Sequence, residues 1–172
     1  MPGHKPMRIL GIDPSSVATG YGIVQADGND SQVLAYGAIK PSRKAALPIR
    51  LLEIKTGLER LISAYNPEEI AIENPFFGLN IKTAITLGQV RGAVLVAVAS
   101  ASLPLFEYSP REIKKAVTGY GQAEKTQVGI MIRALLRIDD DAMEEDASDA
   151  LACAFCHLNT RLAKKNLEEM KI

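Results

Sequence analysis

The fold is decided by the stretch RILGIDPSSVATGYGIVQ, residues 8–25. It contains two short apolar runs, Ile9–Ile12 and Gly20–Gln25, separated by a turn rich in Pro and Ser. Short runs of aliphatic and β-branched residues bounded by turn residues are typical of strands. A third run, Val33–Ile39, follows a Gly-containing turn. The segment therefore predicts three strands in an antiparallel meander.

The periodicity changes after the third strand. Apolar residues recur every three or four positions from Leu47 to Tyr65 and predict an amphipathic helix that ends at Asn66-Pro67. Strands and helices are then expected to alternate, with a strand at Glu69–Glu73, a helix at Ile81–Ser102 and a strand at Leu103–Tyr108. Three helices are expected after them, from Ser109 to Gly119, Glu124 to Ile138 and Asp146 to Leu162. The order predicts an α/β fold with a mixed five-stranded sheet, three strands antiparallel, flanked by helices.

Length and composition favour a single domain. The chain has 172 residues, of which 47% are hydrophobic, enough for one full core. We expect a disordered extension at 1–7, the domain at 8–163 and a polar tail at 164–172. The opening residues lack the apolar run of a signal peptide, and the uncharged stretch Gly92–Phe106 is shorter than the roughly 20 residues that span a bilayer. These features predict a cytoplasmic protein that does not enter a membrane.

Charge is balanced overall but segregated along the chain. The formal net charge is zero, which argues against indiscriminate binding to polyanions. Residues 111–137 nevertheless contain six basic and two acidic side chains, whereas residues 138–149 contain seven acidic and no basic ones. A basic face beside an acidic pocket suits a metal-dependent enzyme that acts on a phosphate backbone. A solvated loop next to a solvated helix explains this feature equally well.

Four carboxylates stand where they can form a site. Asp13 and Glu73 each close an apolar strand, where a side chain is accessible but rigidly held. Asp146 and Asp149 are three residues apart and share one face of a helix. Converging carboxylates repel one another unless a divalent cation lies between them, and Mg²⁺ prefers oxygen ligands. The pattern predicts a split metal site for phosphate chemistry, although each acid alone also fits a surface or capping role.

Several further motifs occur in a fixed order. They are Ile9-Leu10-Gly11-Ile12-Asp13-Pro14, Thr19-Gly20-Tyr21-Gly22, Ala71-Ile72-Glu73, Leu87-Gly88-Gln89-Val90-Arg91-Gly92, Phe106-Glu107-Tyr108, Gly119-Tyr120-Gly121-Gln122-Ala123-Glu124-Lys125 and Asp146-Ala147-Ser148-Asp149-Ala150-Leu151-Ala152. In this order and spacing they resemble the RuvC family of Holliday-junction resolvases, which have an RNase H-like fold. The resemblance covers nearly all of Arg8–Asn159.

The resemblance implies an active site and a reaction. The residues that match the family's catalytic acids and metal ligands are Asp13, Glu73, Asp146 and Asp149. Two Mg²⁺ ions, for which Mn²⁺ can substitute, would bracket the scissile phosphate and leave a 5′-phosphate and a 3′-hydroxyl. Lys114 and Lys125 match lysines that screen charge at this phosphate. The alternative for both is an ordinary exposed helix lysine.

DNA contacts are expected around this site. Phe76 and Phe77 lie in a predicted loop after Glu73, and Phe76 matches an aromatic side chain that stacks on a base near the crossover. For Phe77 the alternative is packing under the loop. The further candidates for contact with DNA are Arg91, Arg111 and Lys115.

Two positions depart from the family pattern. Ser15 stands where Gly is usual, which puts the turn after Asp13 in doubt. Thr86 stands where Lys is common, which removes a possible phosphate contact and predicts weaker binding to the junction.

The resemblance also implies partners. Gly88 and Gly92 place small residues on one helix, where a second helix can approach closely. The alternative is internal packing alone. Family members form two-fold homodimers, whose two identical sites cut two strands of a four-way junction. Delivery of the junction by a RuvA-RuvB type branch-migration complex is a further expectation.

The segment Cys153-Ala154-Phe155-Cys156-His157 matches the attachment motif of c-type haem. We predict no haem, because attachment requires an exported chain and no signal sequence is seen. A zinc site would lack its other ligands. Both cysteines are therefore expected to be reduced and buried in a helix.

The hypothesis that unites these features is a metal-dependent, structure-selective endonuclease that resolves four-way DNA junctions in recombination and repair. One alternative is a catalytically silent junction-binding module. The other is a phosphate-binding ATPase-like relative, since Gly11-Ile12-Asp13 and its turn resemble a nucleotide-phosphate loop. Such ATPases need two lobes, whereas this chain has the length of one.

Overall fold

The computed structural model describes residues 6–28, 30–74 and 80–169. The strands in this part of the chain are β1 (Met7–Asp13), β2 (Thr19–Asp27), β3 (Asp30–Ile39), β4 (Glu69–Glu73) and β5 (Leu105–Tyr108). The helices are α1 (Leu47–Tyr65), α2 (Ile81–Ser100), α3 (Pro110–Thr118), α4 (Lys125–Leu135) and α5 (Glu145–Glu169).

The strands form one mixed sheet in the order β3-β2-β1-β4-β5. β1, β2 and β3 are antiparallel neighbours, whereas β4 runs parallel to β1 and β5 runs parallel to β4. The predicted mixed five-stranded sheet is confirmed. Because β1 and β4 are parallel and pair up to Ile12 and Ile72, Asp13 and Glu73 emerge side by side at the same end of the sheet.

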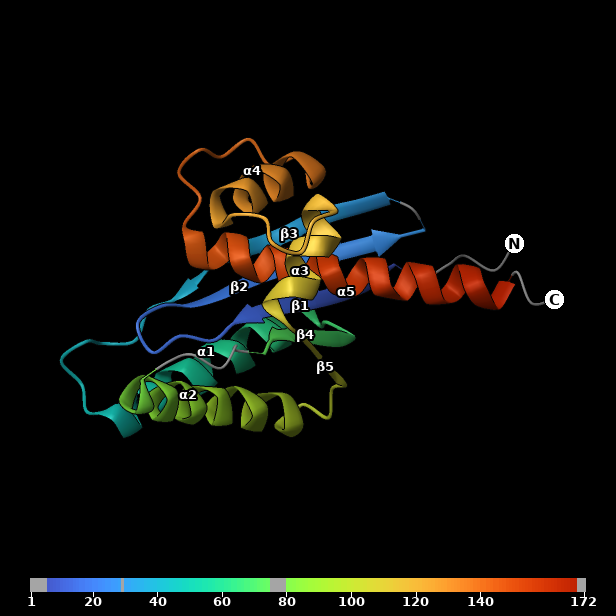
Figure 1. Ribbon diagram of the computed structural model, residues 1–172. Coiled ribbons are helices and arrows are strands. Elements are labelled where there is room, and N and C mark those ends of the chain that lie inside the picture. The colour runs from blue at the N-terminus through green and yellow to red at the C-terminus, as the bar shows by residue number, and fades with distance from the viewer. Residues whose placement is uncertain (1–5, 29, 75–79, 170–172) are drawn as a thin grey trace.

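Helices cover both faces of the sheet (Figure 1). Side chains alternate between the faces along each strand. On β1, Leu10 packs with the buried side chains of α1 and α2, whereas Ile9 packs with those of α3, α4 and α5. The sheet thus lies between two apolar layers, and α5 runs along the second of them.

Two glycines let α5 lie directly on the sheet. A Cβ atom at Gly11 would overlap the carbonyl oxygen of Ala150, and one at Gly20 would overlap that of Asp146. Any side chain at these positions would push the first turns of α5 away from β1 and β2. The close approach places the start of α5 beside the end of β1.

Most predicted boundaries hold, and the clearest differences lie at the two ends. β1 begins at Met7, one residue before the expected start of the domain, and α5 continues to Glu169, past the expected end at residue 163. Residues 163–168 are exposed, so no apolar stripe marks this part of the helix. The predicted start of α3 is confirmed, because Ser109 and Glu112 form a reciprocal capping box ahead of Pro110.

Helix α2 has two different faces. Its buried Val90 and Val94 pack in the core beneath the sheet, whereas Ile81 and Ile85 are 80% and 58% exposed. Among the described residues it is the one helix long and apolar enough to cross a membrane by length and composition, although only 22% of that window is buried.

Candidate active site

Asp13 and Glu73 occupy neighbouring strand ends. Both are the last residues of their strands, and both side chains are half-buried. Residue alternation points them to the side of the sheet where Ile9 and Ala71 pack against α5. The buried strands behind them hold both carboxylates in place.

Helix α5 brings the second pair of acids to the same end of the sheet. Asp146 and Asp149 lie in its first turns, and the Asp149 side chain is only 17% exposed. The close contact between Gly20 and the backbone of Asp146 sets the position of this turn against the sheet.

Three of the four acids open onto one cavity of about 330 Å³. Its polar lining comes from Asp13, Glu73, Asp149, Lys114 and Lys125, which belong to five different elements. Apolar side chains, among them Ile113, Val128 and Ala152, complete the wall. Asp146 is not part of the lining but lies close enough for its charge to raise the pKa of Asp13.

The carboxylates raise one another's pKa values. Burial, followed by the charges of Asp149, Glu73 and Asp146, raises the pKa of Asp13 to about 8. Burial is also the main cause of the raised pKa values of Glu73, Asp146 and Asp149, and nearby lysine charge opposes the rise in each case. The cavity is thus a site where negative charge is costly unless a cation is present.

The donor set fits a hard divalent cation, because all four candidate ligands are carboxylates. The carboxylates do not form a closed cluster: among the described residues, no three His, Cys, Asp or Glu side chains group closely enough to hold a metal ion. The fit to a metal therefore rests on the chemistry and shared cavity of the acids.

Lys125 is held between two acids of α5. Its Nζ donates a hydrogen bond of 2.7 Å to Asp149 Oδ2 and also pairs with Glu145. Burial alone would lower the pKa of Lys125, but the hydrogen bonds to Asp149 and Glu145 outweigh it and raise the pKa, so the ammonium stays charged. The role of Glu145 was not predicted, although its spacing of four residues from Asp149 places both on one helix face.

The segregated charges partly neutralise one another. Besides the pairs of Lys125, Arg133 on α4 lies 3.7 Å from the carboxylate of Asp141 and donates to the carbonyl of Asp140. The basic run and the acidic run are therefore neighbours in space. Arg111 and Lys115 remain exposed on α3, beside a separate hollow of about 620 Å³.

The other predicted DNA contacts have different outcomes. Phe76 and Phe77 lie outside the described residues. Arg91 does not extend toward solvent: its side chain is only 16% exposed and contacts Glu73 and Glu107.

At the two departures from the family pattern, the side chains make local hydrogen bonds. The side-chain hydroxyl oxygen of Ser15 accepts from the Val17 N–H at 3.2 Å. Its backbone carbonyl accepts from the Thr19 hydroxyl at 2.6 Å, which closes the turn after Asp13. Thr86 donates to the carbonyl of Lys82 within α2.

The haem-like motif lies in the core. Cys153 and Cys156 are free and buried, as predicted. His157 is also buried, and its Nε2 donates to Glu69 Oε2 at 2.5 Å while its Nδ1 shares a hydrogen bond of 2.7 Å with the Tyr108 hydroxyl. Because a carboxylate only accepts, the proton belongs on Nε2 and Tyr108 donates to Nδ1. This network joins α5 to β4 and β5.

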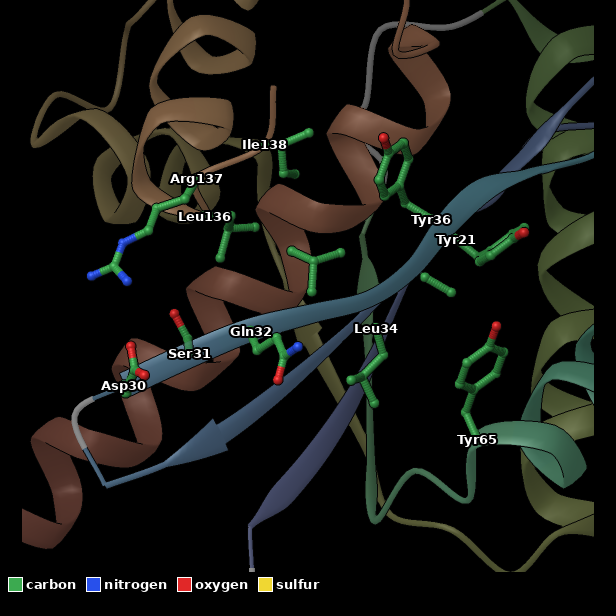
Figure 2. Close-up of a pocket in the computed structure, with 12 residues that line it drawn as sticks. Tyr21, Asp30, Ser31, Gln32, Leu34, Tyr36, Tyr65, Leu136, Arg137 and Ile138 are labelled. Carbon is green, nitrogen blue, oxygen red and sulfur yellow. The ribbon is translucent and has the colours of Figure 1, made fainter. Parts of the chain in front are cut away.

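A more open hollow of about 780 Å³ runs along the edge strand β3. Figure 2 shows Tyr36 and Leu34 on this strand, with Tyr65 nearby at the end of α1. None of the four candidate acids lines it. Its greater size does not make it the active site, because the groups that can do chemistry lie at the other cavity.

Comparison with known proteins gives one consistent result. The family model described as crossover junction endodeoxyribonuclease RuvC matches residues 9–157. The RuvC of Halorhodospira halophila is 49% identical over 156 residues, which cover 91% of this chain and 92% of that protein. The RuvC of Petrotoga mobilis is 44% identical over 160 residues, which cover 93% and 98%.

Solved structures agree with these relatives. The structure of T. thermophilus RuvC in complex with Holliday junction substrate superposes with a TM-score of 0.86 at 30% identity, covering 92% of this chain and 96% of that one. The yeast mitochondrial Holliday junction resolvase has a TM-score of 0.66 at 12% identity and shares the fold.

Proposed function

The chain belongs to the RuvC family of crossover junction endodeoxyribonucleases, and we propose on this premise that the cavity lined by Asp13, Glu73 and Asp149 is its active site. The protein is a nuclease that resolves Holliday junctions in recombination and repair. The observation that carries the assignment is the meeting of carboxylates from β1, β4 and α5 with two lysines in one cavity.

Asp13, Glu73, Asp146 and Asp149 are proposed to hold Mg²⁺, two ions per site, with Mn²⁺ as a substitute. When bound, such ions activate water and stabilise the leaving oxygen of a phosphodiester. Burial and, after it, repulsion by neighbouring carboxylates raise the pKa of Asp13; a bound cation favours the ionised carboxylate, so binding is expected to release a proton near neutral pH.

The remaining residues have distinct proposed tasks. Lys125 and Lys114 present positive charge to the scissile phosphate, where negative charge grows during hydrolysis. Arg111 and Lys115, exposed on the neighbouring helix α3, contact the DNA backbone. Phe76 stacks on an unpaired base. Products with a 5′-phosphate and a 3′-hydroxyl are expected.

The protein is proposed to act in the cytoplasm as a homodimer whose interface includes the exposed face of α2. Gly88 and Gly92 lie on this helix, and a Cβ atom at either position would meet no described atom within 4 Å. Exposed Ile81 and Ile85 precede them on the same helix. A four-way junction has two strands to cut, which two symmetric sites supply. A RuvA-RuvB type complex would deliver the junction.

The test of this function is cleavage of a synthetic four-way junction in Mg²⁺, with a linear duplex of the same sequence as substrate control. Wild type is compared with Asp13→Asn and with Asp139→Asn, which removes an exposed acid outside the cavity. We expect paired symmetric nicks on the junction alone, with the Asp13 variant at least about 100-fold slower. The Asp139 variant should match wild type.

Two results would contradict the proposal. Binding of the junction without cleavage in both Mg²⁺ and Mn²⁺ would indicate a silent binding module. Full activity of Asp13→Asn would place the reaction elsewhere. For the dimer, sedimentation should show that Ile85→Glu dissociates it while Lys82→Gln, on the same helix, does not.

A further inference from the structure

Arg91 connects the last residue of β4 to β5. Its Nη1 donates a hydrogen bond of 3.2 Å to the carbonyl oxygen of Glu73, and its Nη2 lies 2.5 Å from Glu107 Oε1. The guanidinium is mostly buried, at 16% exposure, whereas the Glu107 side chain is 44% exposed. One planar group thus bridges a backbone acceptor and a side-chain carboxylate on adjacent strands.

The contact falls at the end of β4, where Glu73 still pairs with Tyr108 of β5 but no longer with β1. Pairing between β1 and β4 ends at Ile12 and Ile72, one residue before Glu73. On the other side the Asn74 N–H donates to the carbonyl of Tyr108 at 2.8 Å. Arg91 therefore adds a restraint to the peptide group of Glu73, whose side chain lines the cavity.

The restraint comes from the opposite face of the sheet. Val90 and Val94, which lie on either side of Arg91 in the sequence, are fully buried in the core layer that α2 shares with α1, and this packing holds the helix in place. The Glu73 side chain points to the layer of α5 instead. Arg91 thus reaches around the sheet end and fixes an active-site residue without lining the cavity itself.

We propose that Arg91, held by Glu107, is a positioning residue that fixes the backbone of Glu73 and thereby sets the direction of its carboxylate in the active site. This inference rests on the proposed function and differs from a role for Arg91 in DNA contact. Arginine suits the task because its fork donates to two acceptors at once, which a lysine ammonium does with much poorer geometry.

The test measures binding and cleavage separately for Arg91→Gln. Junction affinity is measured over a range of salt with Ca²⁺ in place of Mg²⁺, and cleavage is followed in single turnover at saturating junction. Lys82→Gln is the matched control, since it removes one positive charge from an exposed position of α2. Glu107→Gln weakens the contact that holds the Arg91 guanidinium, by a change at the more exposed partner. This variant serves as the test if Arg91→Gln folds poorly.

A third measurement does not depend on activity. Mg²⁺ is titrated against the melting temperature without DNA, and the concentration that gives half the stabilisation is compared between variants. We expect Arg91→Gln to raise this concentration by about 10-fold and to slow cleavage by about 10- to 100-fold, with junction affinity within about twofold. Glu107→Gln should shift the Mg²⁺ midpoint and the cleavage rate in the same direction. Arg91→Lys should restore little of the wild-type value of either.

Other outcomes overturn the inference. If Arg91→Gln weakens junction binding and lowers the slope of log affinity against log salt by about one, Arg91 contacts a phosphate instead. If cleavage and the Mg²⁺ midpoint both stay at wild-type values, the clamp has no positioning role. Wild-type protein that cuts no junction would instead refute the proposed function, which separates the two failures.

Discussion

Replacement of Asp13 by Asn should stabilise the metal-free protein near neutral pH. Burial and three neighbouring carboxylates raise the pKa of Asp13 from 3.8 to about 8, so the folded state binds its proton more tightly than the unfolded state does. The free energy of unfolding of wild type therefore falls as pH rises from about 4 to about 8, and this contribution levels off above that pH. Asn has nearly the same shape but cannot ionise, so the Asn variant avoids this loss of stability.

The size of the effect follows from the pKa shift. A pH of 7 is about three units above the ordinary pKa of this carboxyl in the unfolded chain, and each unit is worth about 1.36 kcal/mol. The upper limit of the stabilisation at pH 7 is therefore about 4 kcal/mol. Neighbouring charges rearrange and water enters, so we expect about half of this, or about 2 kcal/mol. For a chain of this length that corresponds to about 4–8 °C in Tm.

The assay is urea and thermal unfolding in EDTA from pH 4 to pH 8, with Asp139→Asn as the control. The advantage of Asp13→Asn should be near zero at pH 4 and full by pH 8, whereas the control should stay within about 0.5 kcal/mol of wild type. Added Mg²⁺ should stabilise wild type more than the Asp13 variant. A variant that is less stable than wild type at pH 8, or an advantage that does not shrink on acidification, would refute the reasoning.

Three other perturbations test different parts of the structure. Gly11→Ala should lower the free energy of unfolding by about 2–4 kcal/mol, because the new methyl group overlaps the backbone of α5; an unchanged urea midpoint would contradict this packing. His157→Phe should cost about 2–4 kcal/mol by the same measurement, since the carboxylate of Glu69 loses its buried partner and keeps only the half-exposed Arg161, and a neutral result would deny the network a structural role. Lys125→Gln should slow single-turnover cleavage about 100-fold and displace the pH–rate profile upward, because Asp149 loses the cation that lowers its pKa; an unshifted profile would count against this pairing.

Much of the fold follows from patterns within a few neighbouring residues. Short apolar runs bounded by turn residues mark the strands, and apolar residues at every third or fourth position mark α1. Ser109 with Glu112 marks the start of α3. The C-terminal end of α5 was harder to place, because its last turns are exposed and no longer need an apolar face.

The sequence by itself determined which acids are proposed for the site, since Asp13 and Glu73 end buried strands and Asp149 follows Asp146 by one helical turn. These are local features, set by strand length and helix period. Only the tertiary structure decided the partners of Arg91 and Lys125. Their contacts join residues 16 to 24 positions apart on different elements, so they depend on strand order and on how closely α2 and α5 pack. Basic side chains along a sequence look alike, and the fold determines whether each one meets a carboxylate, a backbone carbonyl or solvent.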